Sequence, residues 1–135
     1  MWLKLSTFGL LPVLLIQGTK VRRNTPRLPE ASGDREGKTG QGKPLSLLIL
    51  GDSAAAGVGV ENQQDALSGA IISELKTEYK LHWKLHAKTG DTTKQVYQAI
   101  QQLEPKKYDV VVTSVGVNDV TKLISAKTWI KQQKQ

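Results

Sequence analysis

The sequence predicts an α/β fold, a three-layer α/β/α sandwich in which helices cover both faces of a parallel sheet. Short apolar runs, each followed by a glycine or a polar turn, alternate along the chain with segments whose apolar residues recur every three or four positions. Such an alternation of strands and helices indicates parallel pairing with right-handed crossovers. The chain has 135 residues, which is enough for one domain of this kind.

The first predicted strand and the first predicted helix of the domain are separated by a loop of small residues. Residues 45–50 (LSLLIL) form a short apolar run that ends at Gly51, which is typical of a buried strand. The loop covers residues 51–59. Over residues 65–79 an apolar side chain recurs at every fourth position, which predicts an amphipathic helix. The stripe consists of Leu67, Ile71, Leu75 and Tyr79.

Two further strands with their helices follow. Residues 81–87 alternate between apolar and polar side chains, the two-residue period of a strand with one face toward water. Either Thr92 or Thr93 can cap the next helix. Residues 108–115 are nearly all apolar and rich in valine, which predicts the third strand. Residues 126–135 are expected to be helical, so the order strand, helix repeats three times.

Two N-terminal segments precede the predicted domain, which covers residues 45–135. Residues 1–23 are apolar and then basic, so they are signal-like or membrane-associating. Two interpretations stay open, a peripheral membrane contact through residues 2–23 or a helix packed on the domain itself. Insertion would leave the domain cytoplasmic by the positive-inside rule, whereas a signal-like N-terminus would allow export. Residues 24–44 are rich in Pro, Gly and charge, which is typical of a linker.

The positive charge is concentrated in these N-terminal segments. The net charge is +7, and eight basic residues but only three acidic ones lie within residues 1–43. The predicted domain is therefore nearly neutral. Its lysines are scattered, and a nucleic-acid-binding face needs clustered Lys and Arg residues, often beside aromatic ones. We therefore expect no nucleic-acid partner.

The segments that follow the three predicted strands are expected to meet. In a parallel sheet the carboxyl ends of neighbouring strands lie at one edge, about 4.8 Å apart. The three segments contain Ser53, Gly90 and Asn118. A hydroxyl, a glycine amide and a carboxamide should therefore surround one crevice.

This set of groups suits acyl transfer. A serine becomes a nucleophile when a base removes its proton, and the tetrahedral oxyanion then needs donors already aimed at it. The backbone N–H groups of Ser53 and Gly90 and the side-chain amide of Asn118 can supply three donors. Glycine at position 90 leaves room for the backbone to approach the oxyanion. Asp52 and Asp119 are expected to support their turns by hydrogen bonding.

The segments LLILGDSAAAGVG, KTGDTT and GVNDV resemble the first three conserved blocks of the SGNH (GDSL) hydrolases. The resemblance covers residues from about 45 to 130 and implies the flavodoxin-like fold of that family. It implies that Ser53 is the catalytic nucleophile, and that Ser53, Gly90 and Asn118 form the oxyanion hole of an ester hydrolase with an acyl-serine intermediate. It also implies a small-molecule ester or lipid-like substrate, no metal and no cofactor. Cysteine is absent, which excludes thiolate chemistry.

The fourth motif of the family, Asp-x-x-His, supplies the acid and the base, and this sequence does not contain it. The histidines after Ser53 are His82 and His86, and we interpret both as solvated residues on the polar face of the second strand. With the strands in the order second, first, third, residues 108–115 form an apolar edge, which proteins normally pair or cover. We therefore expect an incomplete sheet, a truncated domain and little or no turnover.

Two other functions have to be compared with an ester hydrolase. The loop over residues 51–59 lies where a phosphate-binding loop would lie, but it lacks both the Gly-Lys-Ser/Thr end of Walker A and the Gly-x-Gly-x-x-Gly spacing. Nucleotide binding is therefore not expected. The other alternative is a non-catalytic remnant of the same fold that binds a lipid or a partner. Labelling by a serine-directed fluorophosphonate distinguishes this remnant from an enzyme.

Overall fold

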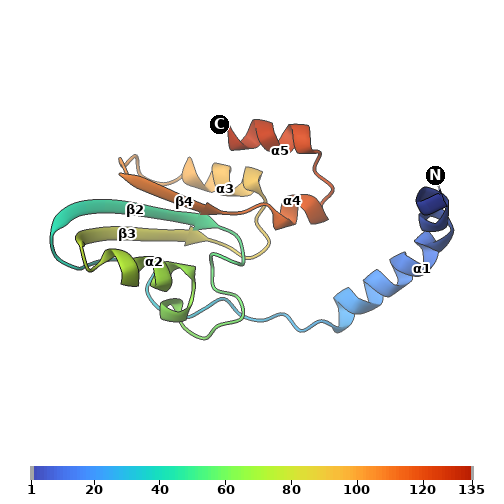
Figure 1. The fold of residues 1–135 in the computed structure, drawn as a ribbon, viewed down its shortest axis with the longest axis horizontal. Helices are drawn as coiled ribbons and strands as arrows, with labels where there is room; N and C mark the ends of the chain where they lie inside the picture. Colours follow the sequence, from blue (N-terminus) through green and yellow to red (C-terminus); the bar gives the residue numbers. More distant parts are fainter. Residues whose placement is uncertain (1, 135) are drawn as a thin grey trace.

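The computed structural model describes residues 2–134 and shows helices on both faces of a four-stranded sheet (Figure 1). The strands are β1 (Glu36–Thr39), β2 (Lys43–Gly51), β3 (Tyr79–Ala87) and β4 (Val110–Ser114). The helices are α1 (Trp2–Asn24), the 3₁₀ helix η1 (Gln63–Asp65), α2 (Leu67–Leu75), α3 (Thr93–Ile100), α4 (Val117–Thr121) and α5 (Ala126–Gln133). The predicted three-layer α/β/α class is confirmed.

The sheet has the strand order β1-β3-β2-β4. Strand β2 is parallel to both β3 and β4, whereas β1 is antiparallel to β3. The predicted order of the three parallel strands is therefore confirmed. Gly51 at the end of β2 pairs with Ala87 on one side and with Ser114 on the other. This register brings the carboxyl ends of the three parallel strands level with one another.

Strand β2 lies at the centre of the sheet because its side chains are buried on both faces. Successive residues of a strand point to opposite faces. Leu47 and Ile49 belong to the cluster covered by α2, and Leu48 and Leu50 belong to the cluster that contains Val96 of α3. In Figure 1, α2 lies on one side of the sheet, and α3 and α5 lie on the other. The continuous apolar run that predicted β2 thus follows from this two-sided burial.

The first helix of the domain is shorter than the helix that the apolar stripe predicted over residues 65–79. Helix α2 ends at Leu75, and Tyr79 lies in β3 opposite Lys43. The turn between β1 and β2 presses against the connection here: a Cβ on Gly40, which has φ +80°, would lie 2.2 Å from the carbonyl oxygen of Tyr79. A single residue such as Tyr79 can satisfy a helical stripe and a strand pattern equally well.

The predicted linker over residues 24–44 differs from the structure in its second half. Strand β1 lies within it and pairs with β3 from Glu36 opposite Lys84 to Thr39 opposite Leu81. Ala31 is buried, and its N–H donates to the carbonyl oxygen of Ala56. The sequence does not predict β1 because this strand is polar and has no apolar pattern. Backbone pairing with β3 holds it in the sheet.

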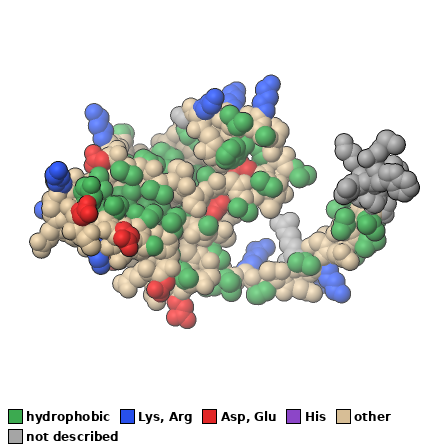
Figure 2. Space-filling view, viewed as in Figure 1, with side chains coloured by type: hydrophobic (Ala, Val, Ile, Leu, Met, Phe, Trp, Pro, Cys, Tyr) green, Lys and Arg blue, Asp and Glu red, His purple; other side chains and the backbone are tan. Residues whose placement is uncertain are grey.

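Helix α1 extends away from the sheet (Figure 1). Residues 10–21 are all exposed, so the expected alternative of a helix packed on the domain does not hold for this part. Hydrophobic side chains gather along α1, with basic ones closer to the domain (Figure 2). Among residues 2–134, no helix is both long and apolar enough to cross a membrane.

Candidate active site

Ser53 directly follows β2 at the carboxyl ends of the parallel strands. Gly51 has no room for a side chain, since a Cβ there would lie 2.4 Å from the carbonyl oxygen of Ser114. The N–H of Asp52 donates to the same carbonyl at 3.0 Å, and Asp52 Oδ1 accepts from the N–H of Ala54 at 3.1 Å. Asp52 is only 2% exposed, whereas Ser53 is half-buried. The backbone on both sides of Ser53 is therefore fixed.

Asn118 joins the segments that follow the three parallel strands. It lies in α4, which begins after Gly116, a residue with φ +137°. Its Nδ2 donates to the carbonyl oxygen of Asp91 at 3.0 Å and, at a longer 3.4 Å, to Oδ2 of Asp52. Asp52 and Asp91 belong to the segments after β2 and β3. The structure thus brings together the three segments that carry Ser53, Gly90 and Asn118.

Gly90 lies in the turn after β3 and has φ +88°. No heavy atom of the described residues lies within 4 Å of the place a Cβ would occupy. Glycine is therefore favoured here by the backbone conformation and not by crowding from the protein. Lys122 Nζ donates to the Gly90 carbonyl oxygen at 3.3 Å. No sequence pattern distinguishes Lys122 from the other lysines scattered over the domain.

Asp119 holds the first residue of α3. It is 2% exposed, and its Oδ2 accepts from the N–H of Thr93 at 2.9 Å and from Thr93 Oγ1 at 3.0 Å. Thr93 Oγ1 in turn accepts from Trp129 Nε1 of α5 at 3.0 Å. Asp119 Oδ1 is buried and has no hydrogen-bond partner among the described residues. Asp119 therefore connects α4, α3 and α5, rather than shaping only its own turn.

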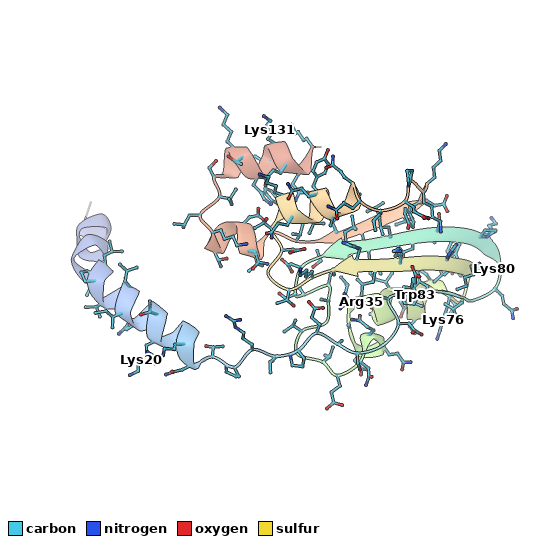
Figure 3. All side chains as sticks on the ribbon, turned by 180° about the vertical axis from the view of Figure 1, so that it is seen from behind. Lys20, Arg35, Lys76, Lys80, Trp83 and Lys131 are labelled. Atoms are coloured by element: carbon cyan, nitrogen blue, oxygen red, sulfur yellow. The ribbon has the colours of Figure 1, made fainter. Side chains whose placement is uncertain are left out.

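Glu30 and Arg35, which precede β1, support the turn after β3. Glu30 Oε1 accepts from the N–H of Thr89 at 2.7 Å. Arg35 donates to Glu30 Oε2 at 2.7 Å and to the carbonyl oxygen of Ala87 at 2.7 Å. Figure 3 shows Arg35 beside the sheet. Both residues were missed in the sequence because they lie in a segment with the composition of a linker.

His82 lies on the body of β3, whereas His86 is the second-last residue of the strand. His82 pairs in register with Ser46, and His86 pairs with Leu50. At about 3.3 Å per residue these positions precede Ser53 by roughly 23 Å and 10 Å along the strand direction. His82 is exposed and His86 is half-buried. This placement agrees with their interpretation as strand residues.

His82 also has a basic environment. Its ring nitrogen lies 3.2 Å from Lys106 Nζ. Partial desolvation, and then the positive charges of Lys106 and Lys38, hold the pKa of His82 below its ordinary value. A neutral imidazole is therefore favoured, but it lies far from Ser53.

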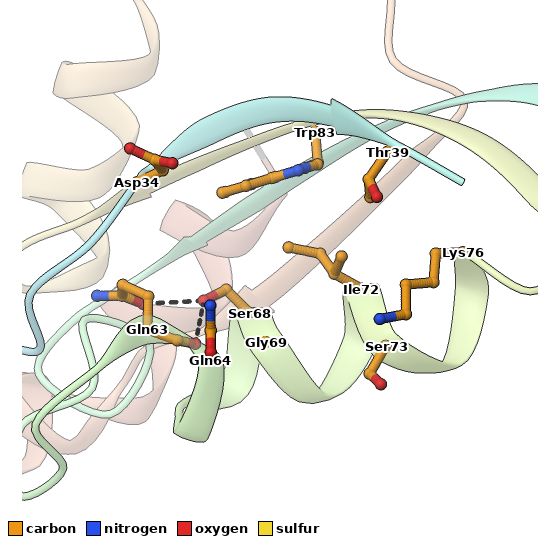
Figure 4. A pocket seen from close by; sticks show the side chains of 10 residues that line it. All are labelled: Asp34, Thr39, Gln63, Gln64, Ser68, Gly69, Ile72, Ser73, Lys76 and Trp83. Atoms are coloured by element: carbon orange, nitrogen blue, oxygen red, sulfur yellow. Dashed lines mark hydrogen bonds between the residues drawn. The ribbon is translucent and has the colours of Figure 1, made fainter. Parts of the chain in front are cut away.

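A recess of about 370 Å³ lies between α2 and the sheet, away from the strand ends (Figure 4). Trp83 and Ile72 form its apolar walls. Its buried polar side chains bond within the protein: Ser68 Oγ donates to Gln63 Oε1 at 2.8 Å, and Gln63 Nε2 donates to the carbonyl oxygen of Ala56 at 2.9 Å. Gln63 therefore supports the loop after Ser53, and we do not assign a reaction to this recess.

Comparisons with known proteins agree with the fold. The crystal structure of AlinE4, an SGNH-hydrolase family esterase, matches with a TM-score of 0.57 and 21% identity, over 69% of this chain and 51% of that chain. The structure of a mutant of esterase AlinE4 gives the same values. The chain thus spans about half the length of these solved structures. A comparison with curated proteins gave no match. The model of the family described as "GDSL-like Lipase/Acylhydrolase family" matches residues 49–134, and the chain therefore belongs to this family of ester hydrolases.

Proposed function

We propose that this chain carries the nucleophile and the oxyanion hole of a serine ester hydrolase that acts on a small-molecule or lipid-like ester. The observation that supports it most directly is the hydrogen bonding of Asn118 to Asp91 and Asp52, which holds three strand-end segments around Ser53. Membership of the acylhydrolase family supports the reaction class. A similar structure is described as that of an esterase.

In the proposed reaction a base takes the proton of Ser53 Oγ as this oxygen attacks the ester carbonyl carbon, and the proton passes to the leaving alcohol. Water then hydrolyses the acyl-Ser53 intermediate, which releases the carboxylic acid and restores the Ser53 hydroxyl. The backbone N–H groups of Ser53 and Gly90 and Nδ2 of Asn118 donate to the oxyanion. The 3.0 Å bond to Asp91 holds the Asn118 side chain in place. The longer 3.4 Å contact with Asp52 is weak, so this second N–H is the one available to a substrate oxygen.

We further propose that these 135 residues alone have little turnover. Ser53 needs a base within hydrogen-bond reach, and the register places His82 and His86 roughly 23 Å and 10 Å before Ser53 along the strand direction. Loss of the base lowers the rate by on the order of a thousandfold or more, even where the oxyanion hole is retained. Efficient catalysis therefore requires a base other than these two histidines.

The second candidate is a non-catalytic remnant that binds a lipid or a partner at the same crevice. The offset of the two histidines from Ser53 along the strand direction is the observation that favours it. The two candidates differ in the reactivity of Ser53. An oxyanion hole aimed at a reacting centre accelerates attack by Ser53, whereas a binding crevice does not.

The experiment is labelling with a fluorophosphonate in the presence of imidazole, which replaces the missing base, followed by mass spectrometry. We expect an adduct on Ser53 in the unmodified chain and none in Ser53→Ala. The matched control is Ser73→Ala, because Ser73 is an exposed serine on α2 and should label like the unmodified chain. A Ser53 that never labels contradicts the nucleophile and supports the binding remnant. Rapid Ser53-dependent hydrolysis of p-nitrophenyl acetate without imidazole contradicts the proposed low turnover.

A further inference from the structure

Helix α1 presents an apolar surface that the domain leaves exposed. Leu10, Leu14, Leu15 and Ile16 are 54%, 49%, 61% and 68% exposed. Leu11 and Val13, on the same stretch, are also exposed. Soluble proteins rarely expose contiguous apolar patches of this kind, and such patches usually mark an interaction site.

The pattern of these residues does not favour another helix as the partner. Residues 13–16 are four consecutive apolar residues, so apolar side chains surround the helix on all sides. A helix–helix seam places apolar residues three and four apart, with polar residues between them. An environment that is apolar all round, such as the acyl-chain region of a lipid leaflet, fits this pattern better than a second copy of the chain.

The length of the apolar stretch sets how it can enter lipid. Residues 2–16 of the helix rise by about 22 Å, which is less than the roughly 30 Å of a bilayer core. The stretch also contains Lys4 and Pro12. No helix among the residues that the structure describes is long and apolar enough to cross a membrane. The stretch is therefore suited to entering one leaflet from one side.

The charge next to the apolar stretch indicates which lipid surface it would meet. Lys20, Arg23 and Arg27 follow the stretch, and all three are exposed. Lys20 lies one helical turn, or about 6 Å, beyond Ile16, which is the depth of the headgroup region. The first acidic residue of the chain is Glu30. This segment is thus complementary to a negatively charged surface.

From this arrangement we propose that α1 attaches the protein to an anionic lipid bilayer. Residues 10–16 enter the acyl-chain boundary of one leaflet, and Lys20, Arg23 and Arg27 contact the lipid phosphates. An apolar insertion combined with a basic segment gives two additive contributions to membrane affinity. This attachment does not depend on the chemistry proposed for Ser53.

The experiment is co-sedimentation of the full chain with vesicles of phosphatidylcholine, either alone or mixed with phosphatidylglycerol. Leu14→Asp removes part of the apolar stretch, and its matched control is Leu123→Asp, because Leu123 is 91% exposed on the domain. A triple variant changes Lys20, Arg23 and Arg27 to Gln. Its control changes three exposed domain lysines to Gln, and these are Lys76, Lys80 and Lys131 (Figure 3).

We expect binding to the mixed vesicles that weakens at about 0.5 M salt, because salt screens the attraction between basic residues and phosphates. Leu14→Asp should lower the partition coefficient by about tenfold or more. The triple Gln variant should lower it on the order of a hundredfold, at about fivefold for each basic residue. Both control variants should bind like the unmodified chain, and circular dichroism should show that all variants keep their fold.

Three results would overturn the proposal. They are the absence of binding to either kind of vesicle, equal binding to both kinds, or unchanged binding of Leu14→Asp. Light scattering of the lipid-free protein provides a further check. A dimer that Leu14→Asp converts to a monomer would assign the apolar stretch to a second copy of the chain instead.

Discussion

The backbone N–H of Thr89 donates a 2.7 Å hydrogen bond to the carboxylate of Glu30, a residue 59 positions earlier in the chain. Arg35 completes the link, because it contacts both Glu30 and the carbonyl oxygen of Ala87. The segment before β1 therefore fixes the backbone just before Gly90. A segment outside the three family blocks thus stabilises the turn that carries one of the proposed oxyanion donors.

Replacing Glu30 by alanine should destabilise the protein. Glu30→Ala leaves the Thr89 N–H without its acceptor and Arg35 without its partner, so we expect the free energy of unfolding to fall by about 1–2 kcal/mol. The measurement is urea denaturation followed by circular dichroism. Glu30→Gln keeps an acceptor oxygen and should lose less than Glu30→Ala. Equal losses in the two variants would show that the Thr89 hydrogen bond contributes nothing.

The same carboxylate should make stability depend on pH. Burial raises the pKa of Glu30, but the hydrogen bonds from Thr89 and Arg35 and the charge of Arg35 together outweigh it, so the pKa lies below its ordinary value in the folded protein. Because the folded pKa is lowered, this stabilisation is present in full above the unfolded pKa and is lost as the pH falls through the folded pKa. The Thr89 amide resonance should titrate with a midpoint below the ordinary pKa of a glutamate. Asp109 and Glu36 also have lowered pKa values, so Glu30→Gln is needed to isolate the contribution of Glu30. A Thr89 titration that survives in Glu30→Gln would contradict this assignment.

The parallel core could be predicted from the sequence because burial leaves a pattern there. Strand β2 is apolar from Leu47 to Leu50 since both of its faces are covered there, and β3 alternates since only one of its faces is covered. Because these strands are parallel, the segments that contain Ser53, Gly90 and Asn118 could be predicted to converge. The catalytic roles of these three residues stay predictions, and the labelling experiment tests them.

The parts that could not be predicted depend on contacts without a local pattern. Strand β1 is polar, and its place in the sheet follows from backbone pairing with β3. The bond from Glu30 to Thr89 and the bond from Lys122 to Gly90 each join residues far apart in the chain through ordinary charged side chains. Neither periodicity nor composition distinguishes such residues from solvated ones.

Asp119 should contribute strongly to stability. Asp119→Ala removes the acceptor of both Thr93 hydrogen bonds at a buried position, and we expect the free energy of unfolding to fall by about 2–3 kcal/mol. Asp119→Asn keeps one acceptor oxygen and should cost about 1 kcal/mol or less. Urea denaturation measures both values. If Asp119→Asn is as damaging as Asp119→Ala, the negative charge matters more than the hydrogen bonds to Thr93.

Gly51 should not tolerate a side chain. A Cβ at this position would lie 2.4 Å from the Ser114 carbonyl oxygen and 2.5 Å from the Cβ of Ala55, so β2 and β4 would have to separate. We expect Gly51→Ala to lower the free energy of unfolding by about 2–3 kcal/mol. The control is Gly18→Ala in α1, where no heavy atom of the described residues lies within 4 Å of the added Cβ. The midpoint temperature of thermal unfolding should fall strongly in Gly51→Ala and change little in Gly18→Ala. Similar changes in the two variants would contradict the inference that Gly51 is crowded.

Asn118 should affect reactivity more than stability. Asn118→Ala removes the proposed oxyanion donor, so the rate of fluorophosphonate labelling of Ser53 in imidazole should fall by about 100-fold. It also removes the hydrogen bond to Asp91, which should cost only about 1 kcal/mol of unfolding free energy. Asn62→Ala is the matched control, because Asn62 is exposed and accepts from Ser32 away from the strand ends. The fraction of folded protein in Asn118→Ala can be measured separately. If the labelling rate falls only as much as this fraction falls, Asn118 has a purely structural role.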